Sequence, residues 1–187
     1  MKKIILSSNS PRRKELLAGL DLNFEVRVLQ SIDESYPAYL PVGEIPLFIA
    51  RQKAAAYTIA DDEIVLTADT VVTVDHQVLG KPCDAQEARR MLRTLSGRTH
   101  RVITGVCLTT TSTQRAFSVT TDVTFRELTD AEIDYYIDRY RPYDKAGAYG
   151  IQEWIGYVGV TGIRGSYFNV MGLPVQRIYQ ELQLMER

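Results

Sequence analysis

Residues 4–17 read Ile4-Ile5-Leu6-Ser7-Ser8-Asn9-Ser10-Pro11-Arg12-Arg13-Lys14-Glu15-Leu16-Leu17. The three apolar residues at its start predict a short buried strand, and the leucines at its end predict the apolar stripe of a helix. Ser10 suits the N-cap of that helix, and Pro11 suits its first position, where a backbone N–H has no intrahelical partner. The stretch is therefore typical of a strand, a hydroxyl-rich turn and a helix, and we expect the chain to be organised around it.

The first turn of this predicted helix carries three consecutive cations, Arg12, Arg13 and Lys14. A cation at the positive end of a helix is unfavourable by about 0.3–1 kcal/mol. Free N–H groups, flanking hydroxyls and two guanidinium groups together favour a bound phosphate. The alternative is a solvated basic turn, because surface cations are common. We interpret the turn as a polyphosphate site.

The composition is typical of a globular protein without a general affinity for anions. The chain has 187 residues, 45% of them hydrophobic and 24% charged, with a net charge of −1. We expect a single domain over residues 1–187, with two lobes sharing one core. The near-neutral charge argues against nucleic acid or a membrane surface as a partner. The apolar run after Met-Lys-Lys is too short for a signal peptide, so we expect a cytoplasmic protein.

Several catalytic classes are excluded by the residue types available. Cys83 and Cys107 are the only cysteines, and His76 and His100 are the only histidines. They form neither a zinc-ligand pattern nor a disulfide framework. No Walker A motif is present, and neither histidine lies in a context typical of a nucleophilic triad.

The most continuous apolar run, residues 64–68, ends directly at Asp69 and Thr70. In open α/β sheets, ligands bind beyond the carboxyl ends of strands, so Asp69 is a site candidate. The alternative for Asp69 is a capping or turn role. Lys53 falls on the apolar face of a helix predicted from Pro46. It either extends past small alanines to solvent or points into a site.

The remaining patterns predict alternating strands and helices. An alternating strand covers residues 24–29, a capping box starts a helix at Asp84, and a second one starts a helix at Thr129. Two strands, over residues 98–108 and 115–125, form a predicted hairpin. Residues 162–174 are predicted to be rich in loops, before a terminal helix from Val175. This mixture predicts an α/β fold with a mixed sheet.

The charged candidates suggest a reaction. Lys53 and Lys81 add cations, while Asp33, Glu34 and Asp69 supply carboxylates. Two carboxylates can hold a hard cation such as Mg²⁺ through oxygen. A metal that bridges phosphates and a carboxylate that orients water suffice for attack at phosphorus. The residues therefore predict metal-assisted hydrolysis or transfer on a polyphosphate ligand.

The stretch Ser8-Asn9-Ser10-Pro11-Arg12-Arg13 resembles the N-terminal signature of the Maf family of nucleoside triphosphate pyrophosphatases, also described as septum-formation inhibitors. Other segments match in family order, so that the resemblance covers essentially the whole chain. They are residues 50–54, 68–72, 79–82, 96–98, 144–147 with Gln152, and 165–174.

This resemblance implies a fold similar to that of inosine triphosphate pyrophosphatases, an elongated α/β structure with two lobes and a central cleft. It also implies hydrolysis of a nucleoside triphosphate to the monophosphate and pyrophosphate with a divalent cation, Mg²⁺ or Mn²⁺. A homodimer is the quaternary state that the family suggests.

The resemblance also implies residue roles. Asp69 matches the family's proton acceptor and could bind the metal, take the proton or do both. Arg12 matches a substrate-recognising arginine, and Thr70 with Gln152 matches the branch that acts on dTTP and UTP. The positions that line the family's phosphate and metal site are matched by Ser8, Arg13, Glu34, Lys53 and Lys81.

One departure from the pattern is Glu153, because the pyrimidine branch more often has glycine after the glutamine. A carboxylate near the base pocket bears on the breadth of substrate choice. A different reading of the chain is a non-catalytic regulator of cell division that binds a nucleotide as a signal. Asp69 together with several phosphate-directed cations favours catalysis, since a sensor needs no general base.

Overall fold

The computed structural model describes residues 2–186, which divide into two compact units. The first unit comprises the chain up to Thr70, Thr104–Val119, and the chain from Gly172 onward. The second unit comprises Val71–Ile103 and Thr120–Met171. Within residues 2–186, no helix has the length and apolar character needed to cross a bilayer.

The elements alternate between strands and helices, as predicted. The elements up to residue 95 are β1 (Lys3–Leu6), α1 (Pro11–Ala18), β2 (Phe24–Val26), η1 (Val42–Glu44), α2 (Ile45–Ala55), β3 (Glu63–Val74), β4 (Gln77–Leu79) and α3 (Ala85–Leu95). The others are β5 (Thr99–Thr109), β6 (Gln114–Phe125), α4 (Asp130–Tyr140), η2 (Ala146–Ala148), α5 (Trp154–Gly159), β7 (Val160–Arg164), α6 (Tyr167–Met171) and α7 (Val175–Met185).

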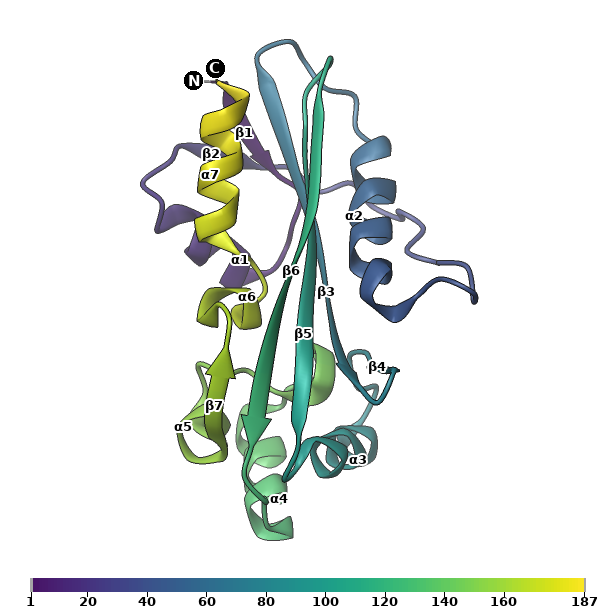
Figure 1. The fold of residues 1–187 in the computed structure, drawn as a ribbon, viewed down its shortest axis with the longest axis vertical. Helices are drawn as coiled ribbons and strands as arrows, with labels where there is room; N and C mark the ends of the chain where they lie inside the picture. Colours follow the sequence, from purple (N-terminus) through teal and green to yellow (C-terminus); the bar gives the residue numbers. More distant parts are fainter. Residues whose placement is uncertain (1, 187) are drawn as a thin grey trace. The chain divides into compact units, whose positions relative to one another are not determined.

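The strands form a seven-stranded sheet in the order β2-β1-β3-β5-β6-β7, with β4 paired to β3 (Figure 1). Strand β1 is parallel to both β2 and β3, whereas β4 and β7 are antiparallel to their neighbours. The predicted α/β class with a mixed sheet is confirmed. Strands β3, β5 and β6 each contribute residues to both units.

In the first unit, helices cover both faces of the strands, and α2 and α7 lie on opposite sides of them (Figure 1). Successive side chains of β1 point to opposite faces of the sheet, which explains this arrangement. Ile5 packs with Tyr57 and Val65, while Ile4 faces residues of α7. On the other side α2 approaches β5 very closely. A Cβ at Gly105 would lie 2.2 Å from the backbone nitrogen of Leu47, so only glycine fits there.

In the second unit, α3 and α4 bury their apolar faces in one core. Leu92 and Leu95 of α3 pack there with Ile133 and Tyr136 of α4. Both predicted N-caps are present, but only the second capping box is complete, because the Glu87 carboxylate accepts from the backbone N–H of Cys83 rather than that of Asp84. Asp84 accepts a hydrogen bond from the Glu87 backbone N–H, and Thr129 and Glu132 cap each other reciprocally.

Some predicted boundaries were wrong. Strand β3 does not end at residue 68, because it runs through Asp69 and Thr70 to Val74. Hydrogen bonding to neighbouring strands holds the backbone extended even where two polar side chains interrupt the apolar pattern. The strand predicted over residues 24–29 is only Phe24–Val26. The segment 162–174, predicted to be rich in loops, contains the end of β7 and all of α6.

Candidate active site

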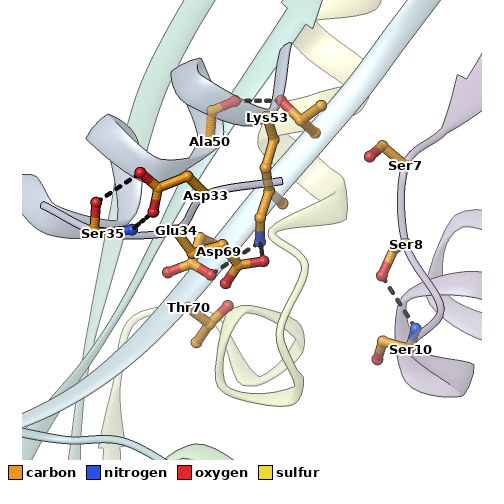
Figure 2. A network of polar contacts seen from close by, with 12 residues as sticks. Ser7, Ser8, Ser10, Asp33, Glu34, Ser35, Ala50, Lys53, Asp69 and Thr70 are labelled. Atoms are coloured by element: carbon orange, nitrogen blue, oxygen red, sulfur yellow. Dashed lines mark hydrogen bonds and ion pairs between the residues drawn. The ribbon is translucent and has the colours of Figure 1, made fainter. Parts of the chain in front are cut away.

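The centre of the candidate site is an ammonium group between two carboxylates of the first unit (Figure 2). Nζ of Lys53 lies 3.3 Å from Oδ1 of Asp69 and 3.0 Å from Oε1 of Glu34. The side chains of Lys53 and Asp69 are 12% and 16% exposed, whereas Glu34 is 55% exposed. Helix α2 therefore directs Lys53 into a polar cluster, which decides between the two alternatives that the spacing left open.

The environment of Asp69 acts on its charge in two opposing ways. Burial raises the pKa of its carboxyl group, and the nearby Lys53 and Arg13 lower it. Burial dominates, so the pKa of Asp69 lies above its ordinary value. A further cation beside this carboxylate would favour its ionised form. The group has the perturbed character typical of functional carboxylates.

Arg13 braces β3 on both sides of Asp69. Its Nη1 donates to the carbonyl oxygen of Ala68 at 2.9 Å, and its Nη2 donates to Oγ1 of Thr70 at 3.1 Å. Its Nε donates to the carbonyl oxygen of Gly172 at 2.8 Å. These bonds fix the strand at the position from which the Asp69 side chain projects. The sequence suggested a substrate role for Arg13, whereas this bracing depends on contacts distant in the chain.

The turn before α1 has the geometry expected of a capped helix start. Oγ of Ser10 accepts a hydrogen bond from the Arg13 backbone N–H at 3.4 Å, which confirms the predicted N-cap. Oγ of Ser8 accepts one from the Ser10 backbone N–H at 3.1 Å (Figure 2). Each hydroxyl keeps its own proton as a donor, so both can still donate to an anion. Arg12 is half-buried in the first turn of α1.

The carboxylates of Glu34 and Asp69 fit a hard divalent cation. Their oxygens are the ligand type that Mg²⁺ and Mn²⁺ prefer, and both already converge on the positive charge of Lys53. Among residues 2–186, no group of three or more His, Cys, Asp or Glu side chains is arranged to hold a metal. A cation here would therefore complete its coordination with substrate phosphate and water, as Mg²⁺ commonly does.

The remaining predicted residues divide between the units. Asp33 does not join the cluster, because its carboxylate accepts hydrogen bonds from the backbone N–H and hydroxyl of Ser35 at 2.8 and 2.9 Å. Lys81 and Gln152 belong to the second unit, where Lys81 is exposed and Gln152 is half-buried. Thr104, which sequence reasoning did not single out, lies with its hydroxyl 2.9 Å from that of Thr70.

Comparisons with known protein families and with individual proteins point to the same family. The sequence profile of the family described as Maf-like protein matches residues 3–185. Proteins named dTTP/UTP pyrophosphatase from Phocaeicola vulgatus and Parabacteroides distasonis are 64% and 60% identical over 183 residues, which is 97% of this chain and 95% of each relative. A Flavobacterium johnsoniae protein of the same name is 48% identical over 96% of this chain and 93% of its own.

A solved structure, a HAM1 protein from Coxiella burnetii, was also matched. It is 17% identical, with a TM-score of 0.44 over 67% of this chain and 73% of that chain.

Proposed function

The chain belongs to the Maf-like protein family, and from that membership we propose that it hydrolyses dTTP and UTP to the nucleoside monophosphate and pyrophosphate with a divalent cation. The similarity to proteins of that name extends over nearly the whole length of both chains. The single structural observation that carries the proposal is the convergence of Asp69 and Glu34 on Lys53. Triphosphate hydrolysis needs such a grouping of carboxylates and cations, and a purely structural strand does not.

In the proposed reaction, Asp69 accepts the proton of the attacking water. Its side chain is mostly buried beside Lys53, which fixes the position from which the carboxylate can accept that proton. Glu34 and Asp69 would hold the divalent cation, which would neutralise phosphate charge when bound. Lys53 keeps the two carboxylates oriented and is close enough to compensate further negative charge.

In this proposal, the cationic side chains of α1 bind the phosphates of the substrate. Arg12 recognises the triphosphate, Ser8 donates its hydroxyl proton, and Arg13 adds positive charge while it braces β3. Helix α1 begins at Pro11, so its dipole is positive at this end. Lys81 supplies a further cation from the second unit.

We assign recognition of the substrate's nucleobase to Thr70 and Gln152. Oε1 of Gln152 is buried and lacks a hydrogen-bond partner within residues 2–186. Uracil and thymine present an N–H between two carbonyl oxygens, so a glutamine amide can accept from the N–H and donate to a carbonyl. A hydroxyl such as that of Thr70 can donate or accept.

The test is incubation of the purified protein with Mg²⁺ and a panel of nucleoside triphosphates, with products separated by anion exchange. We expect monophosphate and pyrophosphate from dTTP and UTP. The same products from a different nucleotide would retain the reaction and reject the specificity. Diphosphate and orthophosphate would overturn the cleavage position. No turnover with Mg²⁺ or Mn²⁺ would favour the regulator, which at present no specific observation supports.

A further inference from the structure

The loop Gly150–Glu153 in the second unit is held at both ends by one hydroxyl group. The backbone N–H of Gly150 donates to the hydroxyl of Tyr136 at 3.0 Å. That hydroxyl donates in turn to Oε2 of Glu153 at 2.6 Å. Tyr136 is fully buried in α4, a helix with a complete capping box, so the hydroxyl is presented from a rigid element. Gln152 lies between the two points of attachment.

The charge of Glu153 is compensated within the same network. Nζ of Lys145 lies 3.0 Å from Oε1 of Glu153 and 2.9 Å from Oδ1 of Asp144. The side chains of Lys145 and Glu153 are only 9% and 19% exposed, so loss of either charge would leave the other poorly compensated. Burial and the adjacent Glu153 both raise the pKa of Tyr136, which keeps its proton available for donation.

The backbone that enters this loop adopts a conformation that the surroundings must enforce. Gly147 and Ala148 have φ values of 71° and 61°, and a left-handed alanine is unfavourable. At Gly150 a Cβ would lie 2.9 Å from Cε of Lys145 and 3.1 Å from Nε2 of Gln152. The loop is thus packed tightly against the lysine and the glutamine amide. Little freedom remains in the position of Gln152.

The tightly packed loop keeps Oε1 of Gln152 buried and without a hydrogen-bond partner within residues 2–186, which is energetically unfavourable. A buried acceptor without a donor costs about 1–3 kcal/mol. A freely mobile loop would turn this amide toward water. A loop that holds it in place therefore preserves an acceptor that a ligand N–H can satisfy.

We propose that Tyr136, Glu153 and Lys145 are positioning residues that fix the Gln152 amide for a base with an N–H donor, and so set the preference for uracil and thymine over cytosine. Cytosine carries an acceptor nitrogen and an amino group where uracil carries an N–H and a carbonyl, so a fixed amide cannot match both. The inference rests on the proposed function.

The experiment compares Tyr136→Phe with a matched control, Tyr140→Phe, by steady-state kinetics on UTP, dTTP and CTP with Mg²⁺. Tyr140 stacks on Tyr136 in the same helix, and no hydrogen bond of its hydroxyl occurs among residues 2–186. We expect Tyr136→Phe to raise KM for UTP and dTTP about tenfold while KM for CTP and all kcat values change little. The preference for UTP over CTP then falls about tenfold. Tyr140→Phe should leave it unchanged.

A second variant, Glu153→Gln, keeps an acceptor for Tyr136 but removes the charge that faces Lys145. We expect it to reduce the preference less than Tyr136→Phe does. Equal losses on all three nucleotides would reduce the network to general structural support and overturn the proposal, as would an unchanged preference in Tyr136→Phe. Urea unfolding of each variant confirms that it is folded.

Failure of the proposed function would be recognised separately, because the wild-type protein would then cleave no nucleotide. In that case binding of UMP and CMP to the same variants, measured by calorimetry, tests the positioning role. We expect Tyr136→Phe to lose affinity for UMP and not for CMP. Equal affinities of the wild-type protein for the two monophosphates would refute it.

Discussion

At the scale of single residues, Asp69 combines partial burial with a charge that the proposed reaction requires. We predict that Asp69→Asn lowers kcat at least about 100-fold, because an amide cannot accept the proton of water. The side chain keeps its shape, so binding of the nucleotide should be largely retained. Single-turnover kinetics and equilibrium binding separate the two effects. Turnover at the wild-type rate would remove Asp69 from the mechanism.

Asp69→Asn should lower activity but should not lower the stability of the fold at neutral pH. The folded-state pKa of Asp69 is raised, so its favourable contribution is complete at low pH and is lost as pH rises through that pKa. Asn imitates the neutral acid. We therefore expect Asp69→Asn to be at least as stable as the wild-type protein at pH 7.5, and its advantage to shrink toward pH 4.

Urea unfolding at the two pH values measures this effect. Glu34→Gln is the control, since that side chain is more than half exposed and its replacement should change stability little. A lower midpoint for Asp69→Asn at pH 7.5 would show that its contact with Lys53 outweighs the cost of burial.

Sequence reasoning identified several of these residues because their signals are local. The N-cap of Ser10 follows from its position before Pro11, and Lys53 was notable as a cation on an apolar helical face. The bracing by Arg13 could not be predicted, because its acceptors lie at Ala68, Thr70 and Gly172. No spacing in the sequence encodes contacts of that range.

At the scale of elements, the position of Lys53 depends on how closely α2 packs on β5. We predict that Gly105→Ala destabilises the fold by about 1–3 kcal/mol or more, because the new methyl group would meet the backbone of α2 rather than a flexible side chain. Activity should fall as well, since α2 carries Lys53.

Urea unfolding and kcat together test this prediction. Gly43→Ala is the control, because a Cβ at that position meets no atom within 4 Å. A Gly105→Ala protein with wild-type stability would show that α2 can shift away from β5 at little cost.

Element boundaries were predictable where the pattern and the end signals agreed. Helices α3 and α4 begin at their capping residues, as expected. Strand β3 was cut short in the prediction because Asp69 and Thr70 look like the end of an apolar run. The strand continues because Val71–Val74 are buried as well. Two polar residues within a paired strand are tolerated where they form a site.

At the scale of the whole molecule, the α/β class followed from the alternation of elements, but the division into units did not. Strands β3, β5 and β6 each contribute to both units, so no linker or change of composition marks a boundary. The units are defined by contacts between distant segments. The predicted single domain, homodimer and cytoplasmic location stay predictions.

Both histidines belong to the second unit, and this predicts how acid affects the molecule. His100 is 2% exposed, with Nε2 2.6 Å from the hydroxyl of Tyr149 and with Phe125 and Tyr149 against its ring. Burial lowers the pKa of His100 to about 4, from about 6.5 in the unfolded chain. Between these values the unfolded chain binds one more proton, so stability falls as pH falls, by about 3 kcal/mol over the window.

We therefore expect urea midpoints to decrease from pH 7 to pH 4.5, with hydrogen exchange rising first in the second unit. The Asp69 carboxyl in the first unit has the opposite tendency, because its raised pKa favours the folded state in acid. His100→Gln should flatten the pH dependence, whatever its effect at pH 7. His76→Asn is the matched control, since His76 is exposed in a left-handed turn that asparagine tolerates, and it should keep the wild-type dependence. An unchanged slope in His100→Gln would place the acid sensitivity in another group.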